Sequence, residues 1–120
     1  MDIIKTLETK LLHMDTVRFG YLFGSFSDNT FTSSSDIDIA LYLDNTSYDT
    51  QAQIIYELSK LLKKDIDLVV LNNIKNIYLL ENIIIKGIVL KDNNNRYDFE
   101  LIKQHDILDF KAFRKFIDAA

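Results

Sequence analysis

The sequence predicts one two-layer α/β or α+β domain, in which helices pack on a mixed sheet of three or four strands. Three observations support this fold class. The chain has 120 residues, the size of a single domain, so we treat residues 1–120 as one unit. Apolar residues make up 48% and charged residues 27%, as in ordinary soluble globular proteins. Finally, segments with a helical period alternate with segments that have a strand period.

The first part of the chain predicts one helix and two strands. Residues 2–14 carry apolar side chains at helical spacing. Along residues 17–23 the side chains alternate in character as in a strand, and this strand ends at Gly24. Residues 25–36 almost lack aliphatic side chains, and their Ser, Asn and Asp favour turns and helix caps. The same alternation of side chains returns in residues 37–43 and predicts a second strand.

The middle of the chain predicts a helix followed by a strand. Residues 47–63 have one apolar face, and Ser47 or Thr50 can cap the helix. Residues 66–71 are almost continuously apolar and predict a third strand that carries Asp67.

A further helix and a short strand are predicted after residue 73. The helix covers residues 74–86, with Asn73 as its cap and Gly87 at its end. Residues 88–90 fit a short fourth strand.

The C-terminal segment is the least defined. Residues 97–102 fit either a strand or a helix, and Asp106 can cap a final helix. The apolar stripe of that helix consists of Phe110, Phe113 and Ile117. We expect the stripe to pack on the sheet, with a partner-binding role as the alternative.

Composition excludes several classes of function. The chain has no cysteine, so disulfides, thiolate zinc sites and cysteine nucleophiles are absent. Its net charge of −4 argues against a broad electrostatic grip on nucleic acid. No apolar run approaches the roughly 20 residues of a membrane span, and the first residues do not resemble a signal peptide. We therefore expect a cytoplasmic protein that binds neither membranes nor nucleic acid directly.

Two aspartates on the second strand point to a metal. Asp36 and Asp38 are two residues apart, so their side chains project from the same face of a strand. Carboxylates this close repel each other unless a cation or a proton lies between them. Oxygen ligands without His or Cys suit a hard cation such as Mg²⁺.

A third acid lies on the next strand. Asp67 sits among apolar residues, where a charge is costly unless something pairs with it. If the two strands are neighbours, Asp67 reaches the same point as Asp36 and Asp38. Three carboxylates can hold two metal ions about 4 Å apart, as in phosphoryl transfer. Asp65 competes for this role because it lies on the same strand face.

Gly24 and Ser25 supply the features of a phosphate site. A glycine at a strand end lets the backbone approach a phosphate closely, and a helix that starts at Ser25 would direct N–H groups and a hydroxyl at it. Taken alone, a Gly-Ser pair after a strand is usually just a turn. Its combination with the aspartates favours a site.

The segment GSFSDNTFTSSSDID resembles the Gly-Ser-x10-Asp-x-Asp signature of the DNA polymerase β-type nucleotidyltransferase superfamily. The size of the chain is similar to that of the minimal nucleotidyltransferases (MNT), a single-domain branch. DIDLVVL resembles the strand that bears the third acid of this family, and NIIIKGIVLKDNNNRYDFE resembles the helix–Gly–strand continuation. The resemblance covers roughly residues 15–110.

The resemblance implies the nucleotidyltransferase fold and transfer of a nucleotide from ATP, with two Mg²⁺ ions, to a hydroxyl. Gly24 and Ser25 would hold the triphosphate, and Asp36 and Asp38 would bind both metal ions. Asp67 would bind the catalytic ion and help to deprotonate the acceptor. Many MNT proteins are antitoxins that adenylylate a tyrosine of a HEPN-type RNase toxin, which implies such a toxin as partner in a hetero-oligomer.

Two positions depart from the family pattern, which often has a basic residue and a glycine after Gly-Ser. Asp28 and Asn29 occupy these positions. Asparagine tolerates left-handed backbone, so Asn29 is a mild change. Asp28 would weaken ATP binding unless its side chain points outward.

Two other functions remain open at this point. The chain could neutralise a toxin by binding alone, with vestigial acids, which Asp28 favours. It could also transfer a nucleotide to a small molecule, although relatives of that kind usually carry a second helical domain for the acceptor.

Overall fold

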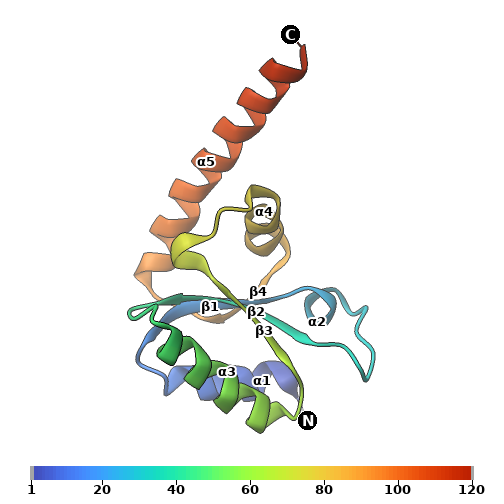
Figure 1. Cartoon of the computed structure of the whole chain (residues 1–120), viewed down its shortest axis with the longest axis vertical. Coiled ribbons are helices and arrows are strands. Elements are labelled where there is room, and N and C mark those ends of the chain that lie inside the picture. The colour runs from blue at the N-terminus through green and yellow to red at the C-terminus, as the bar shows by residue number, and fades with distance from the viewer. Residues whose placement is uncertain (1, 120) are drawn as a thin grey trace.

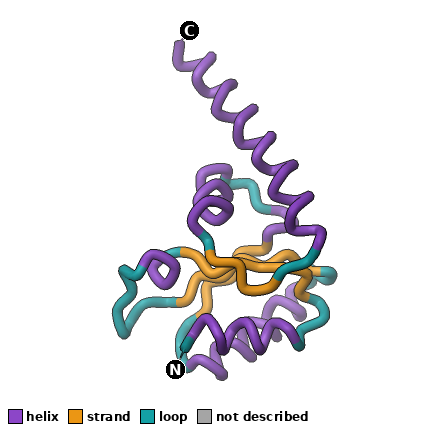
Figure 2. The backbone as a smooth tube through the Cα atoms, turned by 180° about the vertical axis from the view of Figure 1, so that it is seen from behind, coloured by secondary structure: helices purple, strands orange, loops and turns teal. Residues whose placement is uncertain are grey.

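The chain folds around one four-stranded sheet with helices on both faces, as Figure 1 and Figure 2 show. The computed structural model describes residues 2–119. Its elements are α1 (Ile3–Leu12), β1 (Val17–Phe23), α2 (Ser25–Asp28), β2 (Ile37–Leu43), α3 (Tyr48–Leu62), β3 (Ile66–Val70), the 3₁₀ turn η1 (Leu71–Asn73), α4 (Ile77–Lys86), β4 (Ile88–Lys91) and α5 (Asn94–Ala119).

The sheet has the strand order β3-β2-β1-β4 and is mixed. β1 runs antiparallel to both of its neighbours, β2 and β4. β2 and β3 are parallel, and α3 supplies the crossover that a parallel connection requires. The predicted α+β class with a mixed sheet is confirmed, and the short strand proposed for residues 88–90 exists as β4.

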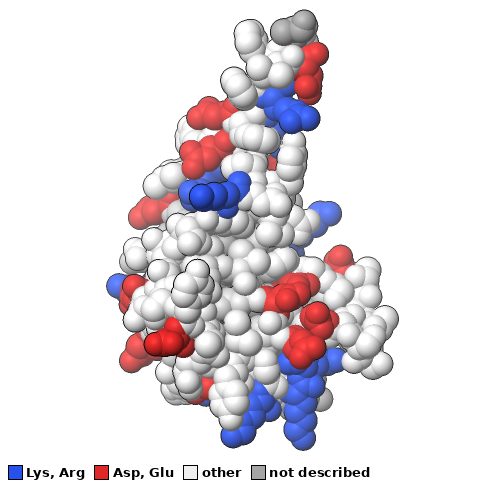
Figure 3. All heavy atoms as spheres, in the orientation of Figure 1, with Lys and Arg blue, Asp and Glu red and all other residues white. Residues whose placement is uncertain are grey.

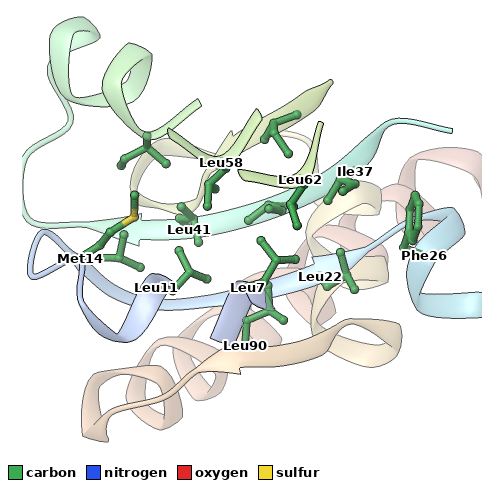
Figure 4. Close-up of a cluster of buried hydrophobic side chains, with 14 of the residues drawn as sticks. Leu7, Leu11, Met14, Leu22, Phe26, Ile37, Leu41, Leu58, Leu62 and Leu90 are labelled. Atoms are coloured by element: carbon green, nitrogen blue, oxygen red, sulfur yellow. The ribbon is translucent and has the colours of Figure 1, made fainter. Parts of the chain in front are cut away.

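Side-chain alternation along β2 divides the interior into two cores. Ile37, Ile39 and Leu41 face the core under α1 and α3, which Figure 4 shows in close-up. Ala40 and Tyr42 belong to the opposite core, which includes buried residues of α4 and α5. A sheet with apolar side chains on both faces needs cover on both. The helices therefore form a layer on each face, one more than the two-layer arrangement expected.

The helix caps follow the sequence in one case and depart from it in another. Ser47 caps α3, as predicted, by accepting a hydrogen bond from the Thr50 backbone N at 3.2 Å. The prediction that Asn73 caps the next helix is wrong, because Leu71–Asn73 forms a 3₁₀ turn. α4 instead begins after Asn76, whose side chain accepts from the backbone N of Leu79 at 3.1 Å.

α5 begins well before the predicted start at Asp106. It runs without a break from Asn94, because its first turns are held by contacts distant in sequence. Phe99 packs on the ring of Phe19 with centroids 5.4 Å apart, and Glu100 accepts a hydrogen bond from the Tyr21 hydroxyl at 2.7 Å. Although α5 has 26 residues, no helix within residues 2–119 is long and apolar enough to cross a bilayer.

The expected packing of the C-terminal stripe on the sheet is wrong, because two of its residues are exposed and the third, Phe110, packs on α4. Phe113 is 64% exposed and Ile117 is 51% exposed. Phe110 is half-buried and stacks edge-on against Tyr78 of α4, with centroids 5.7 Å apart. The C-terminal half of α5 extends away from the sheet, so these side chains have nothing of the domain to cover them (Figure 1).

Candidate active site

Gly24 forms a tight junction between β1 and the carboxylate of Asp38. Its φ of 71° and ψ of −149° are values that L side chains rarely adopt. A Cβ atom at this position would lie 2.2 Å from Oδ2 of Asp38. Only glycine therefore lets the end of β1 approach this acid so closely.

Ser25 begins α2, as predicted, but the helix has only four residues. The backbone N and Oγ of Ser27 donate to the carbonyl of Gly24 at 3.1 and 2.9 Å, which fixes the turn. A single turn sums few peptide dipoles, so its macrodipole adds little. What Ser25 offers to an anion is chiefly its own hydroxyl and the local N–H groups.

The strand register brings two predicted acids together. Asp38 of β2 is the direct partner of Asp67 on β3, and it also pairs with Phe23 at the end of β1. Burial, the charge of Asp67, a hydrogen bond with Asp67 and the charge of Asp36 together raise the pKa of Asp38 above its ordinary value. Like charges are thus concentrated at this point, where Figure 3 shows acidic side chains gathered near α2.

Asp65, the competing third acid, has a different position. It precedes β3, and its carbonyl accepts a hydrogen bond from the backbone N of Ile37 at 2.9 Å. Together with Asp36 it lines a hollow of about 370 Å³ beside Ser33–Ser35. Since Asp67 rather than Asp65 is in register with Asp38, Asp67 is the stronger candidate for the shared site.

The acids suit Mg²⁺ by donor type, because hard cations prefer oxygen ligands. Within residues 2–119, no group of three or more acidic or histidine side chains is already arranged to hold a metal ion. Mg²⁺ is, however, usually bound through one or two carboxylates together with substrate phosphates. Asp38 and Asp67, which are direct partners on neighbouring strands, fit such an ion, and Asp36 lies near enough to affect the pKa of Asp38.

The loop between α2 and β2 is held by contacts that the sequence did not indicate. Phe26 is buried and stacks on Phe31, with parallel rings 4.5 Å apart. Lys64 lies over the Phe26 ring at 5.6 Å and donates to the carbonyl of Ser33 at 2.9 Å. The two aromatic residues within an otherwise polar loop were the available signal. Their stacking joins α2 to the loop that leads to β2.

The two departures from the family pattern are both accommodated. Asn29 adopts left-handed backbone with a φ of 63°, as expected for this residue. Asp28 is exposed, and its carboxylate accepts hydrogen bonds from the hydroxyl and backbone N of Thr30, at 2.6 and 3.1 Å. These bonds lower the pKa of Asp28, with a further contribution from the charge of Lys86. Asp28 therefore stays ionised and is engaged within its own loop.

Comparison with known proteins identifies the fold. The family described as polymerase beta, nucleotidyltransferase matches residues 2–96. The chain belongs to this nucleotidyltransferase family. The match includes the Gly24 turn and all three acids, and it ends just inside α5. None of the curated proteins matches the chain in sequence.

Solved structures of similar nucleotidyltransferase chains come from toxin–antitoxin complexes. A toxin–antitoxin structure with AMP-PNP is 25% identical, covers 95% of both chains and has a TM-score of 0.77. A variant MntA–HpeT complex is 27% identical, with 98% of this chain and 92% of the other covered and a TM-score of 0.72. A complex of tri-AMPylated Shewanella oneidensis HEPN toxin with MNT antitoxin has the same fold, at 24% identity, 97% and 96% coverage and a TM-score of 0.72.

Proposed function

We propose that this chain is a Mg²⁺-dependent nucleotidyltransferase that transfers AMP from ATP to a tyrosine of a cognate HEPN toxin, and thereby acts as its antitoxin. The observation that carries the proposal is the convergence of Gly24, Asp38 and Asp67 at one end of the sheet. Family membership supports nucleotidyl transfer. The toxin as acceptor is supported by the similar structures, one with AMP-PNP and one with an AMPylated toxin.

Each site residue has a distinct task in this proposal. Gly24 and Ser25 would hold the triphosphate, Asp36 and Asp38 would hold two Mg²⁺ ions, and Asp67 would share the catalytic ion. Bound Mg²⁺ would neutralise phosphate charge. The tyrosine oxygen attacks the α-phosphorus, the bond to the bridging oxygen breaks and pyrophosphate leaves. Asp67 accepts the proton of the hydroxyl.

The test is to incubate the chain with the toxin, Mg²⁺ and ATP labelled at the α-phosphate. We expect label on the toxin with the wild type and a loss of about 100-fold or more with Asp38→Asn, because the amide cannot replace the charge of the carboxylate. Asp65→Asn is the matched control and should label at close to the wild-type rate. An unlabelled toxin, or full activity of Asp38→Asn, would contradict the proposal.

Neutralisation by binding alone is the second candidate, and the acidic Asp28 in place of a cation favours it. Cells that express the toxin separate the two functions. If transfer is the mechanism, Asp38→Asn fails to protect them although it still binds the toxin. If binding alone suffices, this variant protects as well as the wild type.

A further inference from the structure

α4 and α5 expose several large apolar side chains to solvent. We call this surface the α4/α5 face and define it by Ile85, Leu101, Leu108, Phe113 and Phe116, which are 55–71% exposed. Ile85 and Leu108 line a hollow of about 260 Å³ between the two helices. The face is therefore continuous from one helix to the other.

Two ion pairs lie beside this surface. Lys111 of α5 pairs with Glu81 of α4, and Arg114 pairs with Asp118 at 3.6 Å. Ile107 is the one α5 residue classed as buried among those described. In Figure 3 much of the projecting helix is neither acidic nor basic.

The area of the α4/α5 face is that of an interface. If a fully exposed large apolar residue presents roughly 200 Å², the five side chains leave about 650 Å² in water. A single patch of more than a few hundred Å² usually marks an interaction site. A standard interface buries about 800 Å² on each partner, which this face and its rim can supply.

The α4/α5 face lies on the same side of the sheet as the candidate site. Asp38 is two residues before Ala40, which belongs to the core under α4 and α5, so both side chains project from that side. α4 ends at Gly87, and the following residue, Ile88, pairs with Leu22 just before the Gly24 turn. A protein docked on this face thus lies beside the acids rather than behind them.

The extent of the similarity connects α5 to toxin complexes rather than to the catalytic domain. The nucleotidyltransferase family match ends at residue 96, so nearly all of α5 lies outside it. The chains from toxin–antitoxin complexes, in contrast, align with 95–98% of this chain and must include most of α5.

We propose that the α4/α5 face docks an amphipathic helix of the HEPN toxin and holds the acceptor hydroxyl of the toxin toward Asp38 and Asp67. The identity of the partner rests on the proposed function. A groove between two helices can bind the apolar face of a third helix. The bound helix contacts such a groove through apolar side chains spaced one turn apart. Docking raises the local concentration of the acceptor and leaves the chemical step to the carboxylates.

Calorimetric titration of the full chain with the toxin tests this surface. The double variant Leu108→Glu with Phe116→Glu should raise the Kd at least about 100-fold, because it places two charges in an apolar contact. Leu12→Glu is the matched control, since Leu12 and Leu108 are both 65% exposed and Leu12 lies on α1, across the sheet. Its Kd should stay within twofold. In the transfer assay the double variant should raise the KM for the toxin and leave kcat and the KM for ATP unchanged.

Several outcomes would overturn the docking proposal. One is an unchanged Kd for the double variant. Another is a wild-type homodimer in light scattering that the double variant dissociates, because the face would then bind a second copy. Phe113→Lys must show the same loss of toxin binding, with an unchanged circular dichroism melt that excludes a folding defect. If the toxin binds with this pattern but the wild type adds no label, docking stands and nucleotidyl transfer fails.

Discussion

Tyr21 carries a hydroxyl into the interior at the point where α5 meets the sheet. The residue is 1% exposed, and its hydroxyl donates to Oε1 of Glu100 at 2.7 Å. Nη1 of Arg96 donates to the same oxygen at 3.0 Å. Burial, reinforced by Glu100, raises the pKa of Tyr21 far above its usual value. The charge of Glu100 is shared by two donors, so the network secures the first turns of α5.

This network predicts a loss of stability in alkaline solution. The pKa of Tyr21 is higher in the folded than in the unfolded chain, so its contribution is complete below about pH 10 and declines as the pH rises further. The free energy of unfolding should fall by up to about 1.4 kcal/mol per pH unit above pH 10. Urea unfolding of the wild type and of Tyr21→Phe between pH 8 and 11 measures this change in the free energy of unfolding. The two curves should converge as the pH rises, and a constant difference would exclude the ionisation of Tyr21 as the cause.

At the scale of single residues, the local part of the site was predictable and the distant part was only partly so. Gly24, Asp36 and Asp38 became candidates because of their spacing along the chain. The resemblance to the family favoured Asp67 over Asp65, and the register of β2 and β3, which no local pattern contains, supports that choice. Lys64 was missed because its contacts with the loop span 31 residues or more.

Among the helices, α4 offers a direct test of where its first turn begins. Asn76→Ala removes the side-chain acceptor for the Leu79 N–H and should cost about 1 kcal/mol of unfolding free energy. Asn73→Ala, at the residue that the sequence favoured, should cost less than about 0.5 kcal/mol, since Asn73 is exposed. Chemical denaturation of both variants gives the comparison. A larger loss of unfolding free energy for Asn73→Ala than for Asn76→Ala would mean that the helix begins after Asn73, as the sequence predicted.

Strands were easier to predict than the start of α5. The hydrophobic pattern and the flanking polar residues predicted β1, β2 and β3. Each strand lies within a residue or two of its predicted bounds. In α5, three asparagines next to Asp92 indicated a turn, and residues 97–102 had no clear period. Phe99 and Glu100 contact β1, and these tertiary contacts stabilise a helix there. The intrinsic secondary-structure propensity of this segment is weak in comparison.

For the molecule as a whole, the site should reduce stability in the absence of metal. Asp67→Asn removes one of two neighbouring carboxylates while an amide keeps a hydrogen-bond partner for Asp38. We expect a gain of about 0.5 kcal/mol after solvent screening, or about 2 °C in Tm, together with the loss of nucleotidyl transfer. Added Mg²⁺ should then raise the Tm of the wild type and of Asp65→Asn, the control, but not that of Asp67→Asn. Scanning calorimetry with and without Mg²⁺ distinguishes these cases. A lower Tm for Asp67→Asn without metal would mean that the Asp38–Asp67 pair stabilises the fold. The presence of two neighbouring carboxyl groups would then be no argument for a bound cation.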